Sequence, residues 1–578
     1  MGYHYIALVQ TAPLDSAPRM SEAQSAFLRA RGLRPCTTNS PFTLFVSSET
    51  PVFTVPCGVV LGHLFCKDGT PAKPDAMPAL ASAEQFASHL LTRYWGEYLL
   101  IQSTTEPAPR LDVLREPSGG VSCLYSLQSG TGFITSDISL AIGLGLYRRQ
   151  IDWDFITQAL AHPHVKTART GLTGIRELLP GCSLILSSAC ATVRQNWSPW
   201  TFVASPRRHH DPHEAAAEIR TTVTSAIKAW AETDKAILME LSGGLDSSIV
   251  ATCLHSTDSR VTYCTFVTPV PGADERQYAR QVTDALGVAL HAEELGFENA
   301  RFDFIPATST ATPRLGILQH VSQEVMAGAA QTHRAASFFS GGGGDSVFCF
   351  LRNAAPAADA FQEKGPSAGF ATIQNLSVLH QCTHWKAGRL TLKKLLHGAK
   401  PPYAANRSFL SSALTIVSPE PHPWLAAPRG ALSGDRERIA DLAGTQVFRD
   451  SAPRGFTHRL RLPLLSQPVM EACLKVPSWM WITGGQDRAI ARAAFADQLP
   501  QGVLERRSKG TFMNYLGAIY QRERLRMREY LLTGHLQEHH LLDVSALEEF
   551  FDAIPPRDTA FTRVFDLCMI ESWLRHQR

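Results

Sequence analysis

The stretch ELSGGLDSSIV, residues 240–250, constrains the fold of this chain more than any other. It follows a short apolar run and precedes a second run compatible with a helix, which predicts a turn between a β-strand and an α-helix. Its glycines leave backbone N–H groups accessible at the start of that helix, where the helix dipole favours a bound anion. The stretch therefore predicts an anion-binding loop in an α/β domain.

The carboxylate of Asp246 restricts the kind of anion that this loop can bind. The loop lacks the lysine of the Walker A pattern, and an unshielded aspartate would repel a phosphate. A Mg²⁺ ion between the carboxylate and a triphosphate removes that repulsion. We therefore expect Asp246 to be a Mg²⁺ ligand; the simpler interpretation is a glycine-rich turn capped by Asp246 or Ser247.

A second glycine-rich stretch, FFSGGGGDS at residues 338–346, repeats the order of an aromatic strand, bare backbone and a carboxylate. Four glycines alone indicate only a flexible turn. Together with the first loop they are more specific, because two carboxylates on two loops can hold Mg²⁺ across a pyrophosphate. The two stretches predict metal ligands at Asp246 and Asp345.

The sequence divides into two predicted domains. Residues 1–205 contain short strand-like runs separated by Gly, Pro and Ser turns, which predicts an α+β or all-β domain. Residues 206–578 begin with a polar, proline-containing boundary and a long helical pattern, after which strands alternate with helices. This alternation predicts an α/β domain with a parallel sheet and helices on both faces.

Composition excludes several classes of protein. The 578 residues carry a formal net charge of +3 without a long charged run, so nucleic acid and membrane surfaces are not expected partners. The 12 cysteines include no CxxC pair, and no uninterrupted apolar stretch is long enough to span a membrane. The N-terminus also lacks the pattern of a signal peptide. We therefore expect a soluble, cytoplasmic protein.

The two loops, taken in order, resemble the synthetase domain of the asparagine synthetase and β-lactam synthetase superfamily, whose first loop binds the pyrophosphate of ATP. The likeness continues in ADERQYA, RLPLL and RSKGTF, at residues 273–279, 461–465 and 507–512. VLREPSGG and GIRELLPG, at residues 113–120 and 174–181, resemble the superfamily's glutaminase-type domain. The resemblance implies an N-terminal β-sandwich of the Ntn type and a C-terminal PP-loop ATP pyrophosphatase domain, which is adenine-nucleotide alpha-hydrolase-like.

The resemblance also implies which residues serve ATP. Lys509 lies where the superfamily has a lysine that reaches the phosphates and the acyl-adenylate, and Glu275 is an acid that can support this site. Both are predicted catalytic residues; a solvated lysine and a helix-start acid are the simpler interpretations. With ATP and Mg²⁺ as cofactors, the predicted ATP-binding residues are Leu241, Ser242, Gly243, Gly244, Asp246, Ser247, Val267, Ser340 and Gly341.

Two positions depart from the glutamine-using members. Those members have a nucleophilic cysteine at residue 2, and family members have a glutamate or tyrosine two residues after the serine of the second loop. This chain has Gly2 and Gly342, and its first cysteine is Cys36. We therefore expect an N-terminal domain without its nucleophile, and an amine other than ammonia from glutamine.

The second loop and the segments at residues 464–471 and 488–492 resemble lasso peptide cyclases, also called macrolactam synthetases. The resemblance implies adenylation of an Asp or Glu side chain in a leader-cleaved precursor peptide. The N-terminal amine of the peptide then closes an isopeptide ring, with AMP and pyrophosphate released, and a leader peptidase is the expected partner. A small-molecule amide synthetase and a non-catalytic nucleotide-binding scaffold are the alternatives.

Three further stretches carry weaker functional signals. Between Asp345 and about Asp450 the family segments are sparse, so we place peptide recognition there.

His535 and His539 have the i, i+4 spacing of a zinc-binding pair, but no third ligand is evident in the sequence. The basic amphipathic stretch RLTLKKLL at residues 389–396 is too short for membrane binding, which predicts a helix with one solvated face.

Overall fold

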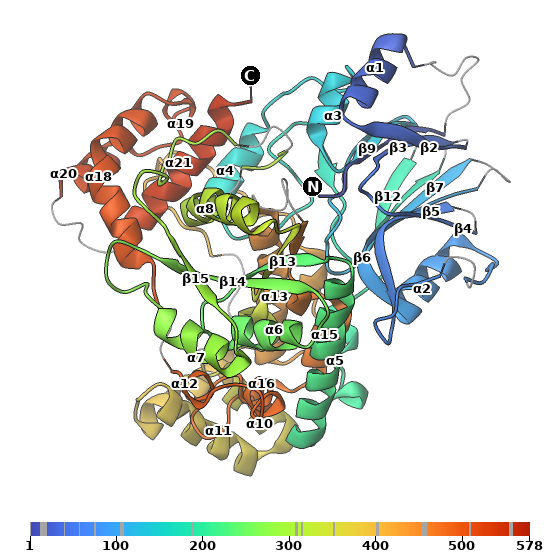
Figure 1. Cartoon of the computed structure of the whole chain (residues 1–578). Coiled ribbons are helices and arrows are strands. Elements are labelled where there is room, and N and C mark those ends of the chain that lie inside the picture. Colours follow the sequence, from blue (N-terminus) through green and yellow to red (C-terminus); the bar gives the residue numbers. More distant parts are fainter. Residues whose placement is uncertain are drawn as a thin grey trace.

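The computed structural model (Figure 1) describes residues 2–11, 20–39, 41–56, 58–73, 77–104, 109–187, 190–306, 310–313, 316–350, 353–399, 404–451, 459–507, 510–553 and 559–577. Within these ranges, no helix combines the length and the apolar character that crossing a membrane requires. The eleven cysteines in the same ranges are free thiols, so no disulfide framework supports this part of the chain.

Two stacked antiparallel sheets form the N-terminal part. The first has the strand order β10 (Arg176–Glu177), β8 (Leu124–Gln128), β9 (Thr131–Thr135), β1 (Tyr5–Gln10), β3 (Phe42–Ser47) and β2 (Leu33–Asn39). The second has the order β12 (Cys190–Gln195), β11 (Cys182–Ser187), β7 (Arg110–Arg115), β6 (Tyr94–Thr104), β5 (Gly58–Cys66) and β4 (Val52–Val55). Apolar side chains from both sheets share one buried core. This arrangement confirms the predicted β-sandwich.

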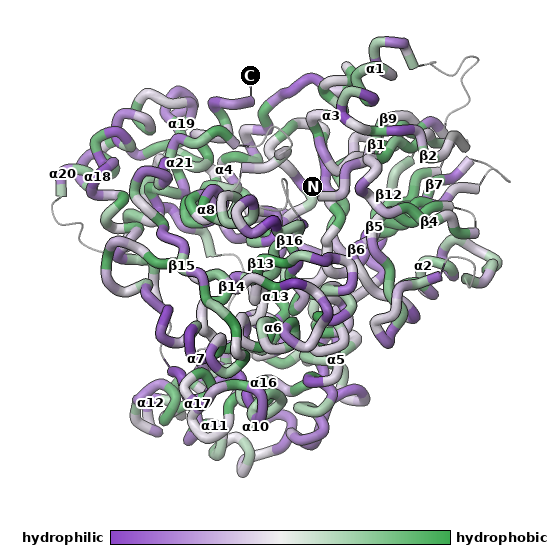
Figure 2. Tube along the Cα trace, in the orientation of Figure 1, coloured by the Kyte–Doolittle hydropathy of each residue, from purple (hydrophilic) through white to green (hydrophobic). Residues whose placement is uncertain are grey.

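Helices cover the outer faces of the sandwich. α1 (Glu22–Ala30), α3 (Ile138–Gly143) and α4 (Trp153–Ala161) pack against the first sheet, and α2 (Ala83–Arg93) packs against the second. Figure 2 shows hydrophobic residues concentrated in strands such as β5. The strand alternation and the helices together give a layered α+β domain, as the first 205 residues predict.

The second part of the chain is built on one parallel sheet. Its order is β15 (Leu290–Glu294), β14 (Arg260–Val267), β13 (Ala236–Glu240), β16 (Ser337–Ser340) and β17 (Arg459–Arg461). The chain runs outward from β13 through β14 to β15 and then returns to the other side of β13 as β16. The order therefore reverses between β13 and β16, which is the position where open α/β sheets bind their ligands.

Helices account for most of the remaining residues of this domain. They are α5 (Pro212–Glu232), α6 (Leu245–His255), α7 (Arg276–Leu286), α8 (Ile317–His333), α9 (Gly344–Val347), α10 (Ala355–Lys364), α11 (Pro366–Leu379), α12 (His384–His397), α13 (Ser433–Ser451), α15 (Gln467–Lys475), α16 (Ala489–Ala494), α17 (Gln501–Leu504), α18 (Met513–Leu532), α19 (His535–Glu538), α20 (Val544–Asp552) and α21 (Phe561–Arg575). The parallel sheet and its helices confirm the predicted α/β domain.

Helix α5 joins the two parts through a shared core. Its predicted apolar positions, including Ile219, Val223 and Ile227, are buried. They pack in one cluster with side chains of β5 and β6 on one side and of β13 and α6 on the other. The change from antiparallel strands to helices falls between Gln195, the end of β12, and Pro212, the start of α5. The boundary at residue 205 stays a prediction within that interval.

A buried ion-pair network also holds the two parts together. The carboxylate of Glu97, on β6, forms an ion pair with Nη1 of Arg461 at 2.7 Å. It forms a second ion pair with Arg449. The hydroxyl of Tyr3 donates to the same carboxylate at 3.0 Å, and Arg461 lies over the ring of Trp230. Both Glu97 and Arg461 are almost fully buried. Each charge therefore depends on its partners for the solvation that water would otherwise provide.

We predict that Glu97→Gln lowers the free energy of unfolding by about 3–5 kcal/mol, because it leaves Arg449 and Arg461 buried without their shared counter-charge. Urea denaturation measures this loss. The matched control is Glu84→Gln, which removes an exposed ion pair with Arg194 and should cost less than about 1 kcal/mol. Similar small losses in both variants would show that the interdomain network does not hold the parts together.

Candidate active site

The two glycine loops face one another at the carboxyl edge of the parallel sheet. The first follows β13 and the second follows β16, the two strands between which the strand order reverses. Glu240 and Ser340, the last residues of these strands, are paired in register. Val267 ends the adjacent strand β14 at the same edge. The sheet thus brings the predicted ATP-binding segments to one edge, although the sequence separates them by up to about a hundred residues.

The first loop turns the chain from β13 into the N-terminus of α6. The hydroxyl groups of Ser242 and Ser247 lie 3.0 Å apart, and the Ser242 hydroxyl accepts the N–H of Gly244 at 3.3 Å. Gly243 has φ +66°, and a Cβ there would lie 2.5 Å from the backbone nitrogen of Ala279 in α7. The loop is therefore a tight turn in which glycine is required, and it opens on the positive end of an eleven-residue helix.

The two loops pack backbone against backbone. A Cβ on Gly341 would lie 2.5 Å from the backbone nitrogen of Ser247, and one on Gly344 would lie 2.4 Å from Cγ of Asp246. No side chain fits at either position without movement of the first loop. These two glycines are therefore needed for the approach of one loop to the other, in addition to any role in binding an anion.

The close approach brings the two predicted metal ligands together. Nη1 of Arg488 lies 3.2 Å from Oδ2 of Asp246 and 3.0 Å from Oδ1 of Asp345. One nitrogen thus contacts carboxylates from both loops. Although burial lowers it, the carboxylates of Asp246, Asp487 and Asp345 together raise the pKa of Arg488 above its usual value. The guanidinium is a fixed positive charge between two acids.

This geometry tests whether the site suits Mg²⁺. Two carboxylates that converge on one cationic atom supply the hard oxygen donors that Mg²⁺ prefers, and the guanidinium marks the point where a cation is stable. Asp246 and Asp345 would hold the ion, whose charge would offset that of the ATP phosphates. The residues present therefore fit the metal, with Arg488 standing in for it.

Arg488 lies in a family-like segment of the sequence, residues 488–492, in which no motif predicts its role. Its backbone has φ +51°, the left-handed region that non-glycine residues seldom adopt, at the start of α16. Its guanidinium also lies 4.7 Å from the ring centroid of Phe350. Strain of this kind is typical of functional positions, but no sequence pattern reports a positive φ at an arginine.

Apolar groups lie beside Gly342, the position at which the sequence offers no side chain. A Cβ there would lie 3.0 Å from Cε1 of Phe448 and 3.1 Å from Cδ2 of Leu462. Phe448 comes from α13 and Leu462 directly follows β17. The space beside the loop that a glutamate or tyrosine would need is therefore bordered by hydrocarbon.

Glu275 acts as an anchor beside the first loop. Its buried carboxylate pairs with Arg506 and accepts the N–H of Gly510 at 2.9 Å. Arg506 in turn donates to the carbonyl of Gly243 at 3.2 Å and stacks on the ring of Tyr278. Glu275 precedes α7 but makes no side-chain capping bond there, so its contacts differ from those of an ordinary helix-start acid. Its predicted catalytic role stays a prediction.

Lys509 itself lies outside the described residues. Arg506 and Gly510, on either side of it, are both bound by the carboxylate of Glu275. Of these two flanking residues, Arg506 also contacts the carbonyl of Gly243 in the first loop. This is compatible with the role that the family resemblance implies for Lys509, which stays a prediction.

The remaining predicted residues occupy supporting positions. Leu241 is buried, and its N–H donates to the carbonyl of Cys264 at 2.7 Å, which ties the start of the loop to β14. The hydroxyl of Ser340 accepts the N–H of Gly342 at 3.2 Å and shapes the second loop. Gly2 lies apart from these groups, in the wall of an interdomain cavity of about 230 Å³ that Glu97, Lys166 and Arg461 also line.

The histidine pair does not form a metal site in the structure. His539 stacks on Trp153 with ring centroids 3.4 Å apart, and His535 pairs with Glu538 at 2.7 Å. His539 caps α19, and its N–H donates to the carbonyl of His535 at 3.0 Å, so the i, i+4 spacing is present. The two imidazoles nevertheless have different partners, Glu538 and Trp153, rather than each other.

We predict that Arg488→Ala changes the response of the protein to Mg²⁺ alone. Without the guanidinium, the two carboxylates repel one another until a metal ion binds, so Mg²⁺ should raise the melting temperature of the variant more than that of the unmodified protein. At 100 times its dissociation constant, a ligand stabilises by about 2.7 kcal/mol. Thermal unfolding with and without Mg²⁺ measures the difference.

Two controls accompany this measurement. Arg488→Lys keeps a cation in place and should respond to Mg²⁺ as the unmodified chain does. The double variant Arg488→Ala, Asp345→Asn lacks one of the two metal ligands. It should lose the larger rise in melting temperature that Mg²⁺ causes in Arg488→Ala. An Arg488→Ala variant whose response equals that of the unmodified protein would mean that the two carboxylates do not share a cation.

Comparison with known proteins identifies the family of the chain. The profile of the asparagine synthase family matches residues 218–575, more than half of the sequence and nearly all of the second domain. A search of curated proteins finds no significant match.

Two solved structures show distant similarity at 9% sequence identity. One is described as the allosteric regulatory enzyme of purine biosynthesis; the match covers 59% of this chain and 84% of that one, with a TM-score of 0.21. The other is glutamine phosphoribosylpyrophosphate amidotransferase from B. subtilis, complexed with ADP and GMP; the match covers 58% and 90%, with a TM-score of 0.23. Similarity at this level does not bear on activity. With its two glycine loops at one crevice and its profile match, the chain belongs to the asparagine synthase family, whose members form amides with ATP and Mg²⁺.

Proposed function

We propose that this enzyme closes a macrolactam ring in a leader-cleaved ribosomal peptide, as a lasso peptide cyclase. The observation that carries the proposal is a contrast between two regions. The loops for ATP are complete and converge on one crevice, whereas the groups that would supply or activate ammonia are missing. Residue 2 is glycine, and Phe448 and Leu462 border Gly342. The amine must then arrive with the substrate.

A peptide N-terminus suits a site without a base at residue 342. Its pKa is about 7.7–8.0, so a sizeable fraction of the amine is neutral at cellular pH. Holding that amine against an activated acyl group can supply much of the rate by proximity. The apolar surroundings of Gly342 favour the neutral amine over its protonated form.

The proposed reaction has two steps. A side-chain carboxylate of the peptide attacks the α-phosphorus of ATP, and pyrophosphate leaves from the N-terminus of α6. The α-amine then attacks the acyl carbon, AMP departs, and the amine loses one proton to solvent. In this proposal Lys509 stabilises the negative charge that develops at the acyl group, and Glu275 positions its segment through Arg506 and Gly510.

Exposed apolar side chains support a peptide-binding role for the region between residues 345 and 450. Helix α12 packs on α10 and α11 and exposes Trp385, Leu392 and Leu396, of which Trp385 is 83% accessible. These positions recur at helical spacing along one side of α12. We propose that this surface contacts the precursor peptide.

We predict that Asp246→Asn and Asp345→Asn each weaken binding of Mg·ATP by about 100-fold or more, because loss of a metal ligand can cost several kcal/mol. Isothermal titration calorimetry measures this directly and needs no peptide. Asp274→Asn is the matched control, since Asp274 is a half-exposed acid paired with Arg276 beside the site. Unchanged affinity in either of the first two variants would remove that residue from the metal site.

The substrate proposal is tested by mass spectrometry with ATP and candidate leader-cleaved peptides. The expected product is a peptide lighter by one water, formed together with AMP and pyrophosphate. Glutamine should neither be hydrolysed nor increase turnover, because Gly2 supplies no nucleophile. Hydrolysis of glutamine, or an amidated linear product from ammonia, would favour a small-molecule type of amide synthetase. Binding of ATP without any turnover would favour a scaffold.

A further inference from the structure

A second cluster of reactive side chains lies on the opposite face of the parallel sheet from α6. Cys264 is a central residue of β14, and its side chain packs with Leu238 and Met326 under helix α8. Glu293 comes from the edge strand β15, and His333 is the last residue of α8. Three elements distant in sequence therefore meet at one point beside the sheet edge.

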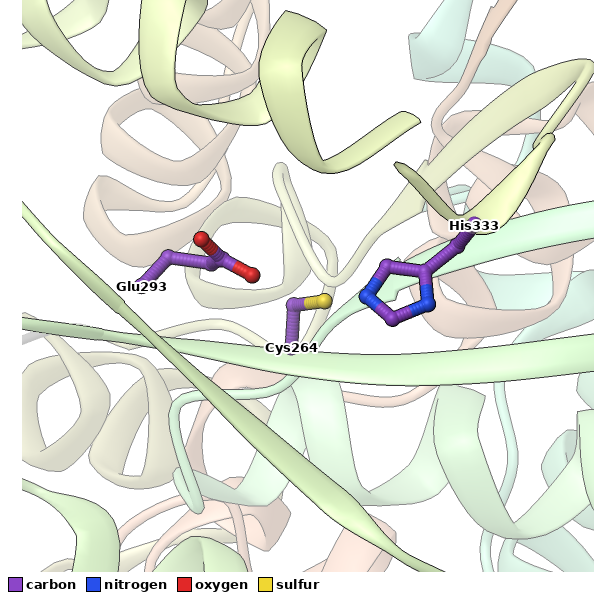
Figure 3. Close-up of side chains that lie close together, drawn as sticks. All are labelled: Cys264, Glu293 and His333. Carbon is purple, nitrogen blue, oxygen red and sulfur yellow. The ribbon is translucent and has the colours of Figure 1, made fainter. Parts of the chain in front are cut away.

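The three side chains converge closely enough to share one metal ion. One ligand atom from each, the thiol sulfur, a carboxylate oxygen and an imidazole nitrogen, lies within 4.8 Å of the other two. Figure 3 shows the sulfur of Cys264 between the carboxylate of Glu293 and the ring of His333. Among the described residues, no other group of three His, Cys, Asp or Glu side chains meets this criterion.

His291 supplies a fourth donor beside the cluster. It pairs in register with Cys264 across β14 and β15, and it lies two residues before Glu293, so both point to the same side of β15. Its ring contacts that of His333 with centroids 4.4 Å apart. Sulfur, two imidazoles and one carboxylate form a four-donor set of mixed type.

The surrounding backbone holds the donors in place. Arg260, at the start of β14, donates to the carbonyls of His333 and Arg334 at 2.9 Å each and so fixes the end of α8 over the sheet. Within the described part of the chain, neither the carboxylate of Glu293 nor the thiol of Cys264 has a hydrogen-bond or ion-pair partner. Donors on rigid elements that lack other partners are preorganised for a ligand.

The buried thiol of Cys264 lies close to the carboxylate of Glu293. Cys264 is almost fully buried, and burial together with the nearby charge of Glu293 raises the pKa of its thiol to about 12. A divalent metal reverses this situation, because it displaces the thiol proton and binds both groups as anions. A bound divalent ion would therefore hold the thiolate and the carboxylate together.

We propose that Cys264, Glu293 and His333, with His291 as the fourth donor, bind one Zn²⁺ ion. A thiolate, imidazole and carboxylate set selects a borderline-soft ion such as Zn²⁺ over Mg²⁺, and four protein ligands leave no open position for catalysis. The ion would tie β15 and the end of α8 to β14, the strand that ends at Val267 in the ATP crevice. The site is structural and separate from the proposed magnesium site.

The test uses the full-length protein, stripped of metal with a chelator and titrated with Co²⁺ and Zn²⁺. Co²⁺ should bind one per chain with thiolate-to-metal charge-transfer absorption, and Zn²⁺ should displace it. Zn²⁺ should also raise the melting temperature, and its binding should strengthen as pH rises, because the thiol proton is released. Cys264→Ser and His333→Ala should each lower Zn²⁺ affinity by about 10-fold or more.

Two controls keep the result decisive. Cys253→Ser alters another buried free thiol, which contacts Thr224 on the other face of the sheet, and should leave Zn²⁺ affinity unchanged. His333 is only partly buried, so His333→Ala remains informative if Cys264→Ser does not fold. Absence of the thiolate absorption in the unmodified protein, or Zn²⁺ affinity in His333→Ala equal to that of the unmodified protein, would overturn the proposal.

Discussion

The contact between the two glycine loops is the constraint on which the rest of the active site depends. Gly341 meets the backbone of Ser247, and Gly344 meets the side chain of Asp246, at distances that admit no Cβ. Because the strands β13 and β16 are adjacent and in register, the loops leave the sheet side by side. Their close packing then places two carboxylates around a single point, which neither loop could achieve alone.

That placement brings two negative charges together, and a residue from a third segment neutralises them. Two carboxylates that approach the same nitrogen atom repel one another, and Arg488 from the start of α16 neutralises them. The cost is a strained backbone at Arg488. A guanidinium and a metal ion cannot occupy the same point, so Mg²⁺ bound at the proposed site would require Arg488 to withdraw from at least one of its partners. In that proposal, the ion pairs of the free protein compete with the metal.

Much of the fold could be predicted from sequence, because local patterns determine it. The strand before the first loop, the helix after it and the periodicity of α5 are all expressed in neighbouring residues. The two aspartates were predictable for the same reason, since each lies in a short glycine-rich motif. His535 and His539 keep their i, i+4 spacing along α19, but their rings contact Glu538 and Trp153, partners that the local pattern does not report.

Contacts between distant segments could not be predicted in this way. Arg488 is 242 residues from Asp246 in the sequence. Arg506 and Gly510, which contact Glu275, are 231 and 235 residues from it. Phe448, which closes the space at Gly342, belongs to a stretch with few family landmarks. The cluster of Cys264, Glu293 and His333 has no motif spacing at all, because parallel strand pairing and the end of α8 bring it together.

The most direct test of this account is a crystal structure with Mg²⁺ and a nonhydrolysable ATP analogue. The account predicts Mg²⁺ bound by oxygens of Asp246 and Asp345 at about 2.0–2.1 Å, with the phosphates at the N-terminus of α6. Nη1 of Arg488 should have left at least one of the two carboxylates. A structure in which Arg488 still bridges both aspartates while the nucleotide binds elsewhere would contradict it.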